Sequence, residues 1–537
     1  MKPLTVLLLL FIYFIPISCT RSVHDPPKLI VLFVVDMMRP DRFIRFENIF
    51  EGGLRWLIDN GTLFTNAHHN HSYTVTGPGH VAIAYGQHPG KLGLIGNSYY
   101  DRVQKRSIYC VEDEKARVIG SDKGKARSMT NYDVKGLGDC IKDNMKSSKV
   151  ISIGGKDRAG CILGGKNPDI AVYYNKNGEF ITSDYYVDIV PKWLENFNQN
   201  SNLNSYKDSL WKRSLSSDLY LDHSREDNYR GEVDDFETDK YSPTFPIGID
   251  KDKEASKVLI SRPWFEREIL NLSIEALKAE KLGIDTQTDL LAIGFSAMDY
   301  MGHKYGPFSQ EMMDAFIKLD KYLDNFINDI DNIVGLENTL FILTADHGVC
   351  PLPEYLLEKG EQGGRINKKN LQEALDWIDD EVEELFGKDL YHRVWTKFYI
   401  NHEKLESENI DKRDIYDVVE KYLTTVVGIE KIIINEDIMN ATVQNEMTIK
   451  FRNMIHPERS PDIYAILSPG YMHMTPHGTT HGSPYKYDTH VPILFSRYGF
   501  KSKSDDTFKT TVDIAPTILQ YLGIEIPRYF DGNTMNL

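Results

Sequence analysis

Five stretches of the chain are almost continuously apolar. Such runs are typical of parallel strands that are buried on both faces of a sheet. They are KLIVLFVVDMM (28–38), KVISIGG (149–155), TDLLAIGFSAMD (288–299), TLFILTADHG (339–348) and VPILFSR (491–497). Helical patterns lie between them, such as the one with Leu270, Ile274 and Leu277 on one face. Strands that alternate with helices predict an α/β fold with a doubly wound, mostly parallel sheet.

Two stretches depart from this alternation of strands and helices. Residues 197–262 are polar and aromatic, and we expect them to form a surface excursion or part of a cap. Residues 351–470 contain two amphipathic helical patterns and the strand-like KIIINED. The apolar positions of the two patterns are Leu371, Leu375, Ile378, Val382 and Leu385, then Ile415, Val418, Val419 and Tyr422. The sequence therefore predicts a core of residues 28–350 and 471–537, with an inserted α+β cap at 351–470.

The N-terminus has the pattern of an export signal. Lys2 precedes the apolar run LTVLLLLFIYFIPIS (4–18), which is shorter than a membrane span of about 20 residues. We expect residues 1–19 to be a signal peptide rather than a buried helix or an uncleaved anchor. Cys19 is a candidate lipoprotein acceptor, although Pro16 stands where such sites usually have leucine. The protein is then periplasmic or secreted, and a lipid at Cys19 would be its one contact with a membrane.

Composition narrows the class of partner. The chain has 537 residues, ordinary globular proportions (41% hydrophobic, 26% charged) and a formal net charge of -16. The negative charge argues against nucleic acid as a partner but allows a small anionic substrate at a locally positive site. Four cysteines follow Cys19, and with no CxxC pair they do not indicate a thiolate zinc knuckle. In an oxidising compartment they permit one or two disulfides, with three possible full pairings among Cys110, Cys140, Cys161 and Cys350.

Polar residues of unusual type come directly after the apolar runs. Each aspartate alone is more often a helix cap, but ligands bind at the carboxyl ends of parallel strands, where these residues would converge. They are Asp36, Lys156, Arg158, Asp299, Asp346 and His347.

Three local clusters suggest metal binding: DYMGH (299–303), ADHG (345–348) and HMTPHGTTHG (473–482). Aspartate and neutral histidine suit zinc. A single such pair is more commonly a helix-capping aspartate and a surface histidine. Three pairs together with Asp36 favour a metal site. The residues alone do not choose among His473, His477 and His481.

A candidate nucleophile lies in SYTVTGPGH (72–80). The glycines and Pro78 would let the backbone turn tightly and present Thr76 at a helix start, where free amides favour a phosphate. TGPG alone is also an ordinary turn. The chain has neither a GxxxxGK[ST] phosphate loop nor a GxSxG elbow.

Taken in order, these motifs resemble a known family. TGPGH, GNSYYD (96–101), GGKDR (154–158), DYMGH, ADHG and GTTHGS (478–483) are similar to those of the PafA-type bacterial alkaline phosphatases. This branch of the alkaline phosphatase superfamily uses a threonine nucleophile. The resemblance extends from KLIVLFVVD to the C-terminal TVDIAPTILQYLGI, whereas DHG alone is shared with phosphodiesterases, mutases and sulfatases.

The resemblance implies two zinc ions and a phosphothreonine intermediate. One ion would be bound by Asp36, Thr76, Asp346 and His347, and the other by Asp299, His303 and His481. The non-bridging phosphoryl oxygens would contact Asn97, Lys156 and Arg158. No catalytic Mg²⁺ is expected. In this family the lysine at the Lys156 position does the work that Mg²⁺ does in other alkaline phosphatases. No family motif uses His68, His69 or His71. We expect these histidines to lie in a loop or to contact the metal ligands without binding a metal themselves.

The predicted function is hydrolysis of small phosphate monoesters. The main alternative is a phosphodiesterase or nucleotide pyrophosphatase. A monoester carries one more negative charge than a diester, and the two cationic side chains of GGKDR therefore favour a monoester substrate. A sulfatase would have cysteine or serine in place of Thr76. A catalytically silent binding protein would lack some of the metal ligands, whereas this sequence has all of them. Transfer of the phosphoryl group to an alcohol, the natural substrate and the oligomeric state stay open.

Overall fold

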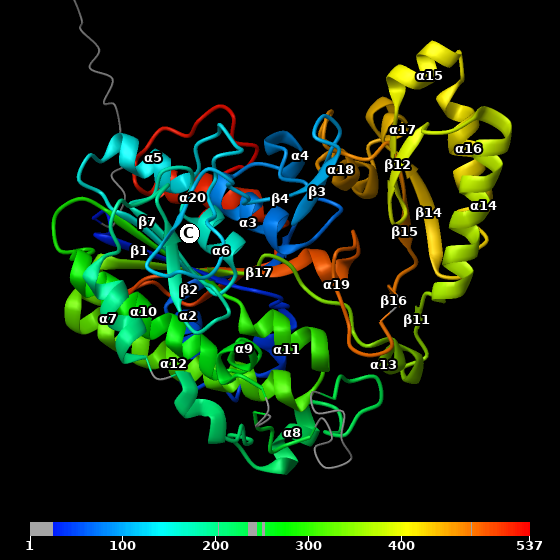
Figure 1. The fold of residues 1–537 in the computed structure, drawn as a ribbon. Coiled ribbons are helices and arrows are strands. Elements are labelled where there is room, and N and C mark those ends of the chain that lie inside the picture. The colour runs from blue at the N-terminus through cyan, green and yellow to red at the C-terminus, as the bar shows by residue number, and fades with distance from the viewer. Residues whose placement is uncertain (1–24, 202, 235–243, 250–252, 474) are drawn as a thin grey trace, which may run out of the picture.

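The computed structural model describes residues 25–201, 203–234, 244–249, 253–473 and 475–537 (Figure 1). The expected signal peptide at 1–19 and Cys19 lie outside the described residues. Within the described ranges, no helix is long and apolar enough to cross a membrane.

The centre of the molecule is an eleven-stranded sheet. Five neighbouring strands run parallel, and every residue in them is buried: β10 (Thr339–Thr344), β1 (Leu29–Val35), β9 (Asp289–Phe295), β6 (Val150–Gly154) and β7 (Ile170–Tyr174). The edges are formed by β17 (His490–Ser496), β2 (Gly61–His68), β18 (Lys503–Asp505) and β19 (Lys509–Thr510) on one side, and β8 (Phe180–Ser183) and β5 (Val118–Ile119) on the other. The prediction of a doubly wound, mostly parallel α/β sheet is confirmed.

One of the five predicted parallel strands runs the other way. Strand β17, the run at 491–497, is antiparallel to both of its neighbours, β10 and β2. Six of its seven residues are buried, so it is as apolar as the parallel strands. Continuous hydrophobicity reports burial on both faces and not strand direction, which is why this part of the prediction is wrong.

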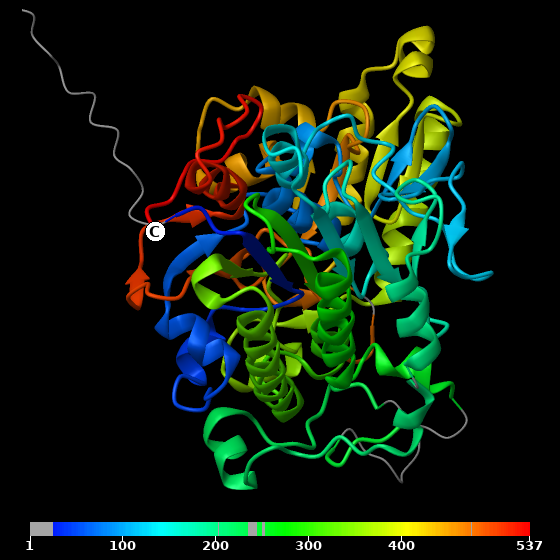
Figure 2. The same ribbon diagram turned by 90° about the vertical axis from the view of Figure 1, so that its left-hand side faces the viewer.

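Helices cover both faces of the sheet, which gives three layers (Figures 1 and 2). The odd-numbered β1 residues, such as Val31 and Phe33, face one helical layer, and the even-numbered ones, such as Ile30 and Leu32, face the other. The first layer contains α2 (Gly53–Asp59), α7 (Lys192–Asn200), α10 (Trp264–Glu280) and α12 (Gln310–Ile333). The second contains α3 (Thr76–Tyr85), α5 (Leu137–Asn144), α6 (Asp157–Leu163) and α20 (Ile514–Tyr521).

The polar stretch 197–262 packs over α12. Its described part includes α8 (Ser217–His223) and α9 (Ala255–Leu259). Trp211 and Tyr220 are fully buried in the main core and both donate hydrogen bonds to Asp314 of α12, at 2.5 Å. The segment is therefore held to the core by aromatic side chains, despite its polar composition.

A separate four-stranded antiparallel sheet is inserted in the chain between β10 and β17, and it is coloured yellow to orange at the right of Figure 1. Its order is β12 (Tyr391–Val394), β13 (Lys397–Ile400), β15 (Ile463–Leu467) and β14 (Ile429–Ile434), and it packs with α14 (Lys368–Phe386), α15 (His402–Glu408) and α16 (Lys412–Leu423) around its own apolar core. The apolar face predicted for α14 is buried as far as Val382, but Leu385 is 59% exposed. In this last turn Phe386 packs against the core in its place.

The four described cysteines are buried free thiols: Cys110, Cys140, Cys161 and Cys350. None of the three pairings left open by the sequence is formed.

Candidate active site

The predicted site residues meet at the carboxyl ends of four parallel strands. Asp36 follows β1, Lys156 comes two residues after β6, and Asp346 and His347 follow β10. Helix α11 (Ala297–Tyr305) begins just after β9 and carries Asp299 in its first turn. Because β10, β1, β9 and β6 are neighbours in register, their ends bring these side chains to one place.

The first group of potential metal ligands is Asp36, Asp346 and His347. Their ligand atoms all lie within 4.8 Å of one another, and all three side chains are fully buried. His347 Nε2 lies 3.3 Å from Asp36 Oδ1 and 3.5 Å from Asp346 Oδ2. None of these three atoms has a hydrogen-bond partner among the described residues. Buried polar atoms left unpaired are costly, and a cation between them would satisfy all three, so this set fits a metal ion.

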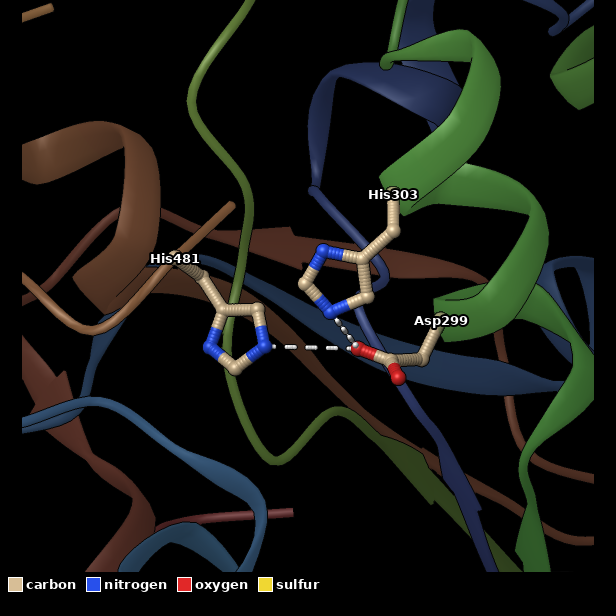
Figure 3. A group of neighbouring side chains, drawn as sticks. All are labelled: Asp299, His303 and His481. Carbon is tan, nitrogen blue, oxygen red and sulfur yellow. Dashed lines mark ion pairs between the residues drawn. The ribbon is translucent and has the colours of Figure 1, made fainter. Parts of the chain in front are cut away.

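The second group is Asp299, His303 and His481 (Figure 3). The Nε2 atoms of His303 and His481 point at Asp299 Oδ1, from 3.2 and 3.3 Å. Their Nδ1 atoms lie 2.8 Å from the backbone carbonyls of Thr479 and Thr74. A carbonyl only accepts, so each Nδ1 carries the proton and each Nε2 is directed toward the carboxylate. This orientation is typical of metal-binding histidines, and the second set fits a metal ion as well.

Lys156 lies between the two groups. Its Nζ is 2.5 Å from Asp36 Oδ2 and 2.5 Å from Asp299 Oδ2, and the side chain is almost completely buried. Burial alone would lower the pKa of Lys156, but Asp299 and Asp36 outweigh it and hold the pKa above its ordinary value. The lysine therefore remains a cation inside the site.

Thr76 is the first residue of α3, as the sequence predicts, and is 1% exposed. Its Oγ1 lies 3.3 Å from Lys156 Nζ and 3.2 Å from Arg158 Nη2. Asn97 Oδ1 accepts a hydrogen bond from the Gly77 amide at 2.8 Å, which orients its side-chain amide beside Thr76. A hydroxyl at a helix start, flanked by a lysine, an arginine and an amide, is suited to a phosphoryl group.

Comparison with known proteins agrees with this geometry. A family model for type I phosphodiesterases and nucleotide pyrophosphatases matches residues 30–491. Alkaline phosphatase PafA of Elizabethkingia meningoseptica is 30% identical over 93% of this chain and 92% of that protein. The chain belongs to the PafA-type alkaline phosphatases.

Two further similarities place it in this family. Alkaline phosphatase PhoV of Synechococcus elongatus is 31% identical over 93% of this chain and 91% of its own. A crystal structure of wild-type alkaline phosphatase PafA superposes with a TM-score of 0.88 at 29% identity, and the alignment covers 96% of this chain and 99% of that one.

In this PafA-type chain, the glycines Gly79, near Thr76, and Gly348, next to His347, allow backbones to approach closely. Gly79 lies inside α3, and a β-carbon placed on it would come within 2.0 Å of the Asp346 carbonyl oxygen. A β-carbon on Gly348 would come within 2.2 Å of the Tyr487 carbonyl oxygen. Both glycines permit close packing of backbone against the segment at 346–348, and neither has a positive φ.

Sequence reasoning missed two contacts of this PafA-type site. His80 Nδ1 lies 2.8 Å from the Thr76 carbonyl oxygen and 3.3 Å from Asp346 Oδ2. The four-residue spacing of Thr76 and His80 on a helix was a usable signal for this contact. The Tyr109 hydroxyl lies 3.2 Å from Arg158 Nη1, and no motif or spacing connects those two residues.

The histidines at 68–71 belong to neither ligand group. His69 Nε2 lies 2.9 Å from the Ala345 carbonyl oxygen and its Nδ1 lies 2.9 Å from Thr511 Oγ1, so it supports the segment just before Asp346. His68 stacks on His490.

Proposed function

We propose that the protein is an exported phosphatase that hydrolyses phosphate monoesters through a phosphothreonine at Thr76. One observation carries the proposal: Thr76 Oγ1 lies within 3.3 Å of Lys156 and Arg158, beside two separate groups of potential metal ligands. That arrangement combines a nucleophile, a binding site for three anionic oxygens and places for two cations. Each is a requirement of in-line phosphoryl transfer.

Two zinc ions are proposed as the metals. Asp36, Asp346 and His347 with Thr76 would hold one ion, and Asp299, His303 and His481 the other. When bound, the two ions would supply positive charge at the attacking and the leaving oxygen. Lys156 supports the absence of a third, catalytic Mg²⁺, because its ammonium contacts a carboxylate of each group.

The chain's own residues have distinct tasks in this proposal. Thr76 Oγ1 gives its proton to solvent and forms a bond to phosphorus, while the bond from phosphorus to the ester oxygen on the opposite side breaks. The leaving oxygen takes up a proton from solvent and departs as the alcohol. Lys156, Arg158 and Asn97 bind the non-bridging oxygens during this step, where most of the charge lies in a loose transition state. Water then cleaves the phosphothreonine, which releases inorganic phosphate and restores Thr76.

A phosphodiesterase or nucleotide pyrophosphatase is the second candidate, since the matching family model is named for those activities. The paired cations at 156 and 158 favour the monoester with its extra charge. A catalytically silent binding protein is less well supported, because no predicted ligand is replaced. Residues 351–470 are proposed as a cap and residues 1–19 as the export signal.

The deciding experiment measures kcat/KM of the zinc-loaded protein at pH 8 on an aryl phosphate monoester and on the matching diester. A strong preference for the monoester, lost on chelation and restored by zinc, is the expected result. A preference for the diester would move the protein to the phosphodiesterase branch. No turnover of either ester by zinc-loaded protein would support a binding protein.

A further inference from the structure

An aromatic ring forms part of the rim of the site. Tyr73 lies three residues before Thr76 and is half-buried. A β-carbon placed on Gly96 would lie 3.5 Å from Tyr73 Cε1, and one placed on Gly482 would lie 3.2 Å from Tyr73 Cε2. Gly96 directly precedes Asn97 and Gly482 directly follows His481. The ring therefore lies between the residue that precedes Asn97 and the residue that follows His481.

The separate antiparallel sheet places a cation on this ring. Lys397, the first residue of β13, has its Nζ 4.2 Å from the centre of the Tyr73 ring. Strand β13 is itself packed against the core, because the Tyr399 ring lies 5.1 Å from that of Tyr100. No described carboxylate forms an ion pair with Lys397. A positioned ammonium with an aromatic partner but no anionic one is available to bind an anion.

An exposed tryptophan lies beside the lysine. Val394 pairs with Lys397, so Trp395 and Thr396 form the two-residue turn between β12 and β13. Trp395 has a φ of 59° and is 52% exposed, and its ring lies 6.2 Å from that of His473. A bulky residue in the left-handed region is a genuine outlier, and the hairpin would accept asparagine or glycine there at lower cost. Such strain at an exposed aromatic residue points to a role in binding.

The position of the rim identifies which part of a substrate it would meet. In the proposed reaction Thr76 attacks from the side of Asp36, Asp346 and His347. The ester oxygen then leaves on the opposite side, toward Asp299, His303 and His481. Tyr73 packs against the residue that follows His481, so it borders the side of the leaving group.

We propose that Lys397, Tyr73 and Trp395 form a leaving-group subsite for phosphate monoesters whose leaving group is aromatic and carries its own negative charge. The inference rests on the proposed function and specifies its substrate class. Lys397 binds the anionic group, while the two aromatic rings cover the ring of the leaving group. In a protein with a formal net charge of -16, a local cation at the rim also offsets repulsion of a substrate that carries a second anionic group besides its phosphate.

Two aryl esters of the same shape but different charge test the subsite: 4-carboxyphenyl phosphate and 4-carbamoylphenyl phosphate. Zinc-loaded wild type is expected to prefer the carboxylate. Lys397→Met should lower kcat/KM on the carboxylate ester by roughly fivefold, as for one partly exposed ion pair, and should change the carbamoyl ester much less. The difference should shrink at about 1 M salt, where exposed charges are screened. Lys388→Met, an exposed lysine of the same unit, is the matched control.

A second variant tests the aromatic wall independently of charge. Trp395→Ala should raise KM for both aryl esters by about threefold to tenfold, and for a short alkyl phosphate by less. Equal effects of Lys397→Met on the two aryl esters, or no effect on either, would overturn the subsite while leaving the phosphatase activity in place. If the wild type hydrolyses no monoester at all, the proposed function fails and the subsite with it.

Discussion

Arg158 Nη2 lies 3.2 Å from Thr76 Oγ1, and the other terminal nitrogen of the guanidinium is held in place. Its Nη1 lies 3.2 Å from the Tyr109 hydroxyl, which donates to Asp157 Oδ1 at 2.5 Å. Asp157 Oδ2 also accepts from Arg127 Nε at 2.8 Å. Burial alone would lower the pKa of Arg158, but Tyr109 and Asp157 outweigh it and raise the pKa above its ordinary value. Thr76, the proposed nucleophile, therefore faces a permanent cation whose orientation is fixed.

Replacing Arg158 should change the selectivity of the enzyme. We expect Arg158→Ala to lower kcat/KM on an aryl phosphate monoester by roughly a hundredfold to a thousandfold, the range found for loss of one transition-state donor. The loss on the matching diester should be smaller, because a diester has one fewer charged oxygen to bind. Steady-state kinetics on both esters measure this difference, and equal losses would argue that Arg158 does not bind the phosphoryl oxygens.

Tyr109 should act through Arg158. Tyr109→Phe keeps the ring but removes the hydroxyl that contacts Arg158 Nη1, so the guanidinium becomes less well oriented. We expect a loss of about tenfold in kcat/KM on the monoester, in the same direction as Arg158→Ala. In the Arg158→Ala background the same change should have little further effect, because the two residues act as one unit. Additive losses in the double variant would rule out this coupling.

Thr76→Ala should abolish the covalent intermediate. We expect no phosphothreonine after acid quenching, as measured by mass spectrometry, and a loss of turnover of several orders of magnitude. Zinc content should remain close to two ions per chain, because six of the seven proposed ligands are unchanged. Thr76→Ser, which retains a hydroxyl, is the control and should still form a phosphoenzyme. Unaltered turnover of the alanine variant would remove Thr76 from the mechanism.

Much of this site could be predicted because its residues follow the most buried strands. Runs such as Leu29–Val35 are visible as continuous hydrophobicity, and a charged residue directly after such a run stands out. The choice of His481 over His473 was different. The ring of His481 is oriented by the carbonyl of Thr74, 407 residues away in the chain, and local sequence contains no trace of that contact.

Other features depend on packing between distant segments. The direction of β17 is set by its place between β10 and β2, not by its own residues. The reason for glycine at 79 is the Asp346 carbonyl, which belongs to a loop more than 260 residues further on. Motif resemblance identified Gly79, within TGPGH, without giving the physical cause, and no motif covers β17.

Gly79→Ala, a substitution inside α3, should therefore displace the loop that carries Asp346 and His347. Alanine is a better helix former than glycine, so propensity alone predicts stabilisation by roughly 1 kcal/mol. The added β-carbon would instead come within 2.0 Å of the Asp346 carbonyl oxygen and displace the ligand loop. We expect weaker zinc retention and a large loss of activity, measured by metal analysis after dialysis and by kcat/KM. Gly248→Ala is the control, because its β-carbon would meet only Leu210, at 3.4 Å. Equal zinc retention in both variants would contradict the close approach.

Glu266 should make stability depend on pH. This residue of α10 is fully buried, and its Oε1 accepts from the amides of Ala297 and Met298 at the start of α11, at 2.6 and 3.1 Å. Burial outweighs these hydrogen bonds and raises its pKa from an ordinary value of 4.5 to about 8. Between those values the folded protein retains a proton that the unfolded chain has released. The free energy of unfolding therefore falls as pH rises through this window, by an amount on the order of a few kcal/mol.

Glu266→Gln keeps the acceptor and removes the charge, so it should abolish this contribution. We expect the free energy of unfolding of the zinc-loaded variant, minus that of zinc-loaded wild type, to become more positive from pH 6.5 to pH 9. Denaturant titration of both proteins measures this difference. Most other titrating groups cancel in that difference, because they are common to both proteins. Glu275→Gln, an exposed position on the same helix, should show no such trend. Parallel pH profiles for Glu266→Gln and wild type would mean that Glu266 is ionised throughout and stabilised by the amides at the start of α11.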